Sequence, residues 1–150
     1  MSPEALRSLA RWHAFAAWSA TAGLVVAAWL FARASKVRRA AGAAAVGLVL
    51  AAAGLGLALS DPYRARLRQR LFVEAPGMGW LFERKLHLAY AAVLLAVSAL
   101  AMTLRIDRGR LDGPGARELR WAAALGWTAS AALALAASIA SAVVGGRTHF

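Results

Sequence analysis

Two histidines occupy matching places in the chain, and their placement suggests a specific chemistry. His13 and His87 are each the second residue of a long uncharged run, Trp12–Ala32 and Leu86–Leu104. Two imidazoles that face each other across a helix bundle can ligate a haem iron from both sides. The pair predicts b-type haem as a cofactor, with both histidines as axial ligands. The alternative, left open by the sequence, is that both histidines lie at a membrane interface and bind nothing.

Charged residues beside these histidines would complete such a site. Glu83 lies four residues before His87 on the same helical face, where its carboxylate can orient the imidazole. Arg11, Arg84 and Lys85 are placed to pair with the haem propionates. The alternative for Glu83 and His87 is an ordinary pair of neighbours on one helix.

Other chemistries lack the residues that they need. The chain has no cysteine, which excludes thiolate catalysis, cysteine-bound zinc and iron–sulfur clusters. It has no nucleophile–base pair, phosphate-binding glycine loop or metal-spaced carboxylate cluster, so hydrolase, kinase and metalloprotease functions are excluded. We expect no metal other than haem iron, and whether the protein is an enzyme stays open. The net charge of +11 does not indicate nucleic acid, because the basic residues flank apolar segments, where they meet lipid phosphates.

Four long apolar runs would form the helices that position the histidines. They cover about residues 12–32, 40–60, 84–105 and 120–146, and about 20 helical residues cross a hydrocarbon core. We therefore predict a single-domain, all-α integral protein of an inner or plasma membrane, folded as a four-transmembrane-helix up-down bundle. The first and third helices would be diagonal neighbours across its core. Aromatic residues near the ends of the runs predict an interfacial belt: Trp12, Trp29, Phe31, Trp80, Trp121 and Trp127.

The connection between the second and third runs contains a basic amphipathic segment. Asp61-Pro62 is expected to end the second helix, because the residue before a proline disfavours the helical conformation. Within residues 63–73, apolar side chains recur every four residues and arginines occupy the other faces. We predict a short interfacial amphipathic helix that contacts anionic lipid headgroups, with a solvated basic loop as the alternative.

Small residues form a stripe along the fourth run. Gly126, Ser130, Ala134 and Ser138 are spaced by four, so they share one helix face, which a neighbouring helix can approach closely. The stripe closes either the chain's own bundle or an interface with a second copy or a membrane protein partner. The second possibility supports a competing function, a non-catalytic accessory or structural subunit of a larger membrane complex.

The order of motifs along the chain resembles a known group of membrane proteins. A histidine opens the first run, a basic turn follows it, and Asp61-Pro62 follows the second run. The third run is preceded by the pattern Trp80-Leu81-x-x-Arg84-Lys85-Leu86. Over roughly residues 12–95, this order resembles the four-helix cores of copper-resistance D-like proteins and HemJ-type protoporphyrinogen oxidases. The resemblance implies haem b at His13 and a functional role for Lys85 or Arg84.

These observations lead to one expected function. We expect a small polytopic membrane protein that binds b-type haem between His13 and His87 and transfers electrons to or from a quinone or a redox partner. A third possibility, lipid binding or membrane remodelling, follows from the basic charge alone.

Overall fold

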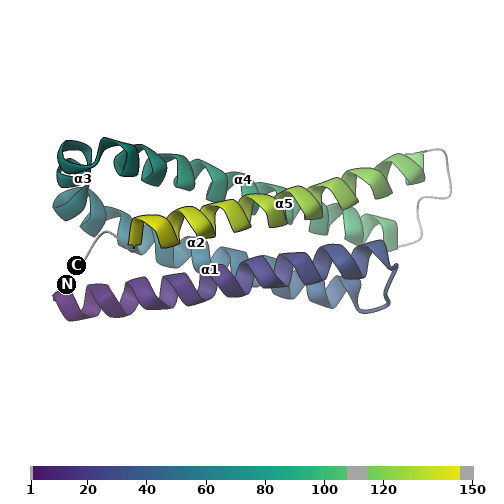
Figure 1. Ribbon diagram of the computed structural model, residues 1–150. Coiled ribbons are helices and arrows are strands. Elements are labelled where there is room, and N and C mark those ends of the chain that lie inside the picture. Colours follow the sequence, from purple (N-terminus) through teal and green to yellow (C-terminus); the bar gives the residue numbers. More distant parts are fainter. Residues whose placement is uncertain (1, 108–114, 146–150) are drawn as a thin grey trace.

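Four long helices form where the sequence has its long apolar runs (Figure 1). A computed structural model describes residues 2–107 and 115–145, and this part of the chain is almost entirely helical. The long helices are α1 (Pro3–Ala32), α2 (Arg38–Tyr63), α4 (Pro76–Asp107) and α5 (Gly115–Gly145). Each is long and apolar enough to cross a membrane, which supports the predicted multi-pass membrane protein.

Local sequence explains where α1 begins and ends. The Ser2 hydroxyl accepts a hydrogen bond from the backbone N–H of Ala5 at 3.2 Å, and a proline in the first turn lacks the N–H that would otherwise be unsatisfied. The helix ends in the basic turn at residues 33–37, where Ala34 adopts the left-handed conformation, with φ of 50°. The turn joins α1 and α2 into a hairpin of two packed helices.

The connection between the second and third spans differs from the prediction. Helix α2 does not end at Asp61-Pro62 but continues to Tyr63, and a π-helical turn, η1 (Arg64–Arg68), leads directly into α3 (Gln69–Glu74). A proline within a helix removes one hydrogen bond and can kink the helix without ending it. Among the described residues of this segment, those that face the protein are Tyr63, Leu67, Leu71 and Phe72, while the arginines are exposed. The segment is therefore helical and two-faced, and its place in the headgroup region stays a prediction.

The four long helices form an up-down bundle. Helix α1 packs against α2 and α5, and α4 packs against α5 and α2, so that α1 and α4 occupy opposite corners. The start of α1, the end of α5 and the short α3 lie at one end of the bundle, and the α1–α2 turn lies at the other (Figure 1). This arrangement matches the predicted diagonal relation between the first and third spans.

Small residues fill the centre of the bundle, and large apolar residues cover its outside. Alanines dominate the core, while Phe15 and Leu94 are 67% and 69% exposed. The distribution suits a lipid environment, in which close approach of helices through small residues drives packing.

The small-residue stripe of α5 packs inside this chain. A Cβ on Gly126 would lie 3.0 Å from the Cβ of Ala99 on α4. The Ser130 hydroxyl donates to the carbonyl of Ala92 on α4 at 2.8 Å, and the hydroxyls of Ser138 and Thr21 on α1 are 3.2 Å apart. Of the two alternatives for the stripe, these contacts favour closure of the chain's own bundle over an interface with a partner.

Trp127 does not belong to the interfacial belt that the sequence predicts. Its side chain is 1% exposed and fills the bundle between α4, α5 and α2, where a Cβ on Gly42 would lie 3.0 Å from the indole ring. The indole N–H donates to the hydroxyl of Thr103 on α4 at 3.1 Å. The hydrogen bond satisfies the polar atom and permits burial of the largest side chain in the core.

Candidate functional site

Two adjoining cavities lie in the half of the bundle nearest α3. The smaller has a volume of about 100 Å³ and the larger about 360 Å³. Both are lined by residues of α1, α2, α4 and α5, and the residues that they share include His13, Gly56, Lys85 and Ser138. The cavities are mainly apolar, and His13 and Lys85 are the titratable side chains common to both.

His13 reaches the cavities from α1 and is held in one orientation. Its Nδ1 lies 3.0 Å from the carbonyl oxygen of Ala52 on α2. Because a carbonyl only accepts hydrogen bonds, Nδ1 carries the proton, and Nε2 of the neutral ring keeps a free lone pair. A Cβ on Gly56 would lie 3.0 Å from the His13 Cε1 atom, so the glycine lets the imidazole rest against α2.

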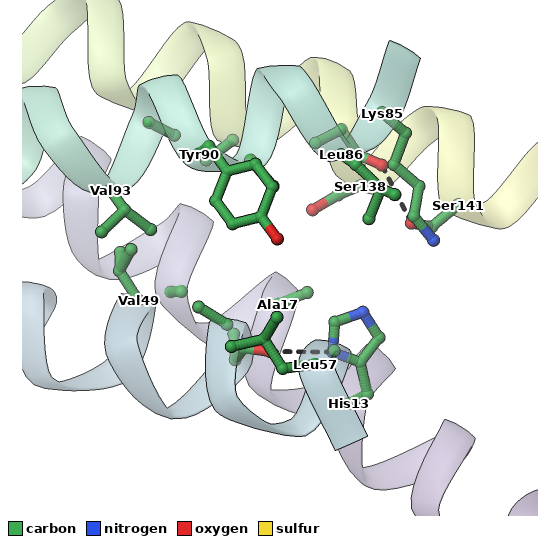
Figure 2. A pocket seen from close by; sticks show the side chains of 18 residues that line it. His13, Ala17, Val49, Leu57, Lys85, Leu86, Tyr90, Val93, Ser138 and Ser141 are labelled. Carbon is green, nitrogen blue, oxygen red and sulfur yellow. Dashed lines mark hydrogen bonds between the residues drawn. The ribbon is translucent and has the colours of Figure 1, made fainter. Parts of the chain in front are cut away.

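Lys85 enters the same space from α4, on the opposite corner of the bundle. Figure 2 shows its amine and the Tyr90 hydroxyl pointing toward the space above the His13 ring. The Lys85 Nζ atom lies 4.4 Å from the centroid of the Phe82 ring, a favourable cation–π contact. Within the described part of the chain, Lys85 forms no ion pair, so its charge faces the cavity without a counter-ion.

Tyr63 forms a wall of the larger cavity, a role that the sequence analysis did not predict. Its ring stacks on Phe82, with centroids 3.6 Å apart and planes inclined by 16°. The side chain is 6% exposed, and its hydroxyl has no hydrogen-bond partner among the described residues. In the sequence, Tyr63 stood out only as the first of three apolar residues that recur every four positions, followed by Leu67 and Leu71. This repeat indicates a helix face that packs inward, but it does not indicate a binding site.

His87 does not join His13 at the cavities. It is exposed, lines neither cavity, and its Nδ1 lies 3.0 Å from the backbone carbonyl of Glu83 on the same helix. Lys85 and His87 are two residues apart, which separates them by about 200° around the helix axis. Only one of them can face the bundle, and in this structure it is Lys85. The structure therefore does not bring the two expected axial ligands together.

The other charged residues predicted for the haem site lie outside the cavities. The carboxylate of Glu83 accepts a hydrogen bond from Arg68 Nε at 3.1 Å, so it is the backbone of this residue, and not its side chain, that contacts His87. Arg11 and Arg84 are exposed and line neither cavity. Across residues 2–107 and 115–145, no three His, Asp or Glu side chains gather into a group that could hold a metal ion.

Comparison with protein-family models, with curated proteins and with solved structures finds no match to this chain. The resemblance to copper-resistance D-like and HemJ-type proteins therefore stays a prediction that depends on the motifs alone. The chemistry of the two cavities is the basis for the function proposed below.

Proposed function

We propose that this membrane protein binds b-type haem in the two cavities and transfers electrons to or from a quinone or a redox partner. His13 would bind the haem iron, and Lys85 would pair with a propionate. The observation that carries the proposal is the convergence of His13 and Lys85 on one space from opposite corners of the bundle. The resemblance assigns haem binding to the first of these positions and a functional role to Lys85 or Arg84, of which only Lys85 lines the cavities.

The tautomer and the ring orientation of His13 are those of a typical iron ligand. Histidines that bind metals usually donate the proton of their other ring nitrogen to a carbonyl or carboxylate, which fixes the tautomer and the ring orientation. The contact between Nδ1 and the Ala52 carbonyl supplies this arrangement and leaves Nε2 available. Nε2 is turned toward the cavity in Figure 2.

The walls around His13 also suit a flat apolar macrocycle. Side chains of Ala17, Ala53 and Ala134 leave space between the helices, and the larger cavity falls within the range of about 300–1,000 Å³ that ligand pockets occupy. Bound haem would supply one-electron oxidation and reduction. The residues of the chain would bind and orient it and keep water away from it.

The proposal uses one protein imidazole and differs in this from the pair of ligands that the sequence predicts. It gives His87 no role, because that side chain faces away from the cavities. The small-residue stripe of α5 packs on α4 and α1, so it does not favour the alternative of an accessory subunit held through span four.

The test is an absorption spectrum of protein purified in detergent from cells supplied with haem, first oxidised and then reduced with dithionite. The wild type and His87→Ala should both show a Soret band that shifts on reduction. His13→Ala should lose it. A wild type without haem absorption would overturn the proposal, and so would a His13→Ala variant that keeps the wild-type spectrum.

A further inference from the structure

The smaller cavity reaches the outside of the bundle between α2 and α4. Among the described residues that line it, the exposed side chains are Leu57 of α2 and Tyr90 of α4, which are 57% and 51% exposed. The lining residues that α1 and α5 contribute are buried or half-buried. The opening of the cavity therefore lies beside Leu57 and Tyr90.

This opening lies within the apolar part of the two spans. Tyr90 follows the start of its apolar run at Leu86 by four residues, and Leu57 precedes Asp61 by four residues. At 1.5 Å per helical residue, both side chains are attached about 6 Å inside the ends of their runs. In a protein that spans the membrane, a ligand enters here from the bilayer, and a water-soluble redox protein has no direct access.

The hydroxyl of Tyr90 is a hydrogen-bond donor at this opening that the proposed function does not use. It points toward the space above the His13 ring in Figure 2, and no described residue accepts a hydrogen bond from it. The Ser138 hydroxyl of the same cavity, in contrast, is paired with Thr21 at 3.2 Å. Acyl chains offer no acceptor at this depth, so an oxygen atom of a ligand is the partner that the hydroxyl needs.

The larger cavity reaches the opposite side of the bundle, between α1 and α5. Among its described lining residues, the exposed ones are Ala14, Trp18 and Ala142, which carry no hydroxyl and no charge. The two openings therefore differ in chemistry. The opening between α2 and α4 is the one that combines an apolar entrance with a hydroxyl directed inward.

We propose that a quinone dissolved in the bilayer binds at the opening between α2 and α4, beside Leu57 and Tyr90. Its flat, uncharged ring suits the apolar walls, and one of its carbonyl oxygens accepts a hydrogen bond from the Tyr90 hydroxyl. The ring needs no counter-ion, so Lys85 stays available for a haem propionate. This inference chooses the quinone over a soluble redox partner. It rests on the proposed function for the transfer of electrons, but not for the binding of the quinone.

The first test labels purified protein in nanodiscs with a photoreactive azidoquinone and locates the label by mass spectrometry. The label should fall on α2 and α4 around Leu57 and Tyr90, and excess decylubiquinone should prevent it. Leu57→Trp fills the opening and should lower this labelling several-fold. Leu50→Trp is the matched control and should keep it, because Leu50 is 51% exposed on the same helix and lines neither cavity.

The second test measures the hydrogen bond. Tyr90→Phe keeps the ring at the opening and removes the hydroxyl, so about three- to tenfold more decylubiquinone should be needed to prevent labelling, as expected for the loss of one hydrogen bond. Tyr63→Phe is the control and should compete like the wild type, since Tyr63 does not line the smaller cavity.

Two results would overturn the inference. One is labelling that decylubiquinone does not prevent in the wild type, as expected if lipid acyl chains fill the opening. The other is wild-type behaviour of both Leu57→Trp and Tyr90→Phe. Neither test requires haem, so a protein without haem absorption that still binds the quinone here would overturn the proposed function and leave this inference standing.

Discussion

At the scale of single residues, the orientation of His13 depends on what α2 places behind it. The imidazole is fixed by a hydrogen bond to the Ala52 carbonyl and by the absence of a side chain at Gly56. Ala52 and Gly56 are four residues apart on α2, so they lie one helical turn apart on the same face. The position of the proposed iron ligand is therefore a property of the α1–α2 contact as much as of His13 itself.

Gly56→Ala should disturb this contact. The added Cβ would lie 3.0 Å from His13 Cε1, so the ring or the helix has to move, and overpacking of this kind typically costs about 1–3 kcal/mol. We expect a lower unfolding temperature in detergent and weaker haem binding. Gly54→Ala is the matched control, because its Cβ would meet nothing within 4 Å and should be neutral or slightly stabilising. Equal effects of the two substitutions would contradict the packing argument.

Some residues of the candidate site could be predicted from the sequence, and others could not. His13 was a predicted site residue because it opens an apolar run at the same place as His87, and Lys85 because it lies beside such a run and in the motif of the resemblance. His87 had the same signal, but which of two nearby residues faces the core depends on the rotation of α4 about its axis. An apolar helix that contacts lipid on one side and protein on the other gives little indication of that rotation. Gly56 and Tyr63 matter only through contacts made in three dimensions.

At the scale of elements, polar contacts determine how α4 and α5 fit together. Trp127 donates to Thr103, and Ser130 donates to the backbone of α4, both in fully buried surroundings. Between apolar helices in lipid, hydrogen bonds of this kind favour one rotation of each helix about its axis and one position along its neighbour. Both contacts occur together with the rotation of α4 that places Lys85 at the cavities.

Thr103→Val should weaken the α4–α5 pairing. The substitution leaves the shape nearly unchanged and removes the acceptor of the buried indole N–H, an unsatisfied group that costs about 1–3 kcal/mol. Thermal unfolding in nanodiscs should shift downward. Thr128→Val on α5 is the control, because the Thr128 hydroxyl is exposed and bonds only to carbonyls of its own helix. A Thr103 variant as stable as this control would show that the Trp127 contact does not hold the pair.

The lengths of the helices were less predictable than their number. Long apolar runs indicate spans, but α1 begins at Pro3 and α4 at Pro76, both well before their apolar runs. A proline can start a helix as readily as it can end one, and at Pro62 it does neither, since the helix passes through it. Sequence reasoning that treats each proline as a boundary misplaces the connection between α2 and α4.

For the whole molecule, the up-down arrangement makes a prediction about topology. Ser2 and Glu74 lie at one end of the bundle and Ser35 at the other, so a protein that spans the membrane exposes them on opposite sides. The chain has no cysteine, which makes single-cysteine variants direct probes. A membrane-impermeant maleimide should label Ser2→Cys and Glu74→Cys from one side and Ser35→Cys from the other. Labelling of Glu74→Cys and Ser35→Cys from the same side would contradict the arrangement.

The sequence leaves the absolute orientation open, because a four-span topology divides its 18 Lys and Arg residues equally between the two sides of the membrane. The maleimide experiment resolves it directly, because intact cells and inverted vesicles expose opposite faces. The orientation in turn decides which compartment lies next to the proposed site, since His13 and Lys85 lie in the half of the bundle nearest α3.

The most direct test of the central claim, that His13 alone of the two histidines anchors haem, is a rescue experiment. His13→Gly removes the ligand and leaves space for a free imidazole at the place of the side chain. We predict that this variant, purified with haem present, lacks the reduced-minus-oxidised haem spectrum and regains it when imidazole is added, while His87→Gly needs no imidazole. A His13→Gly variant with the full spectrum in the absence of imidazole, or a loss of the spectrum in His87→Gly, would contradict the account.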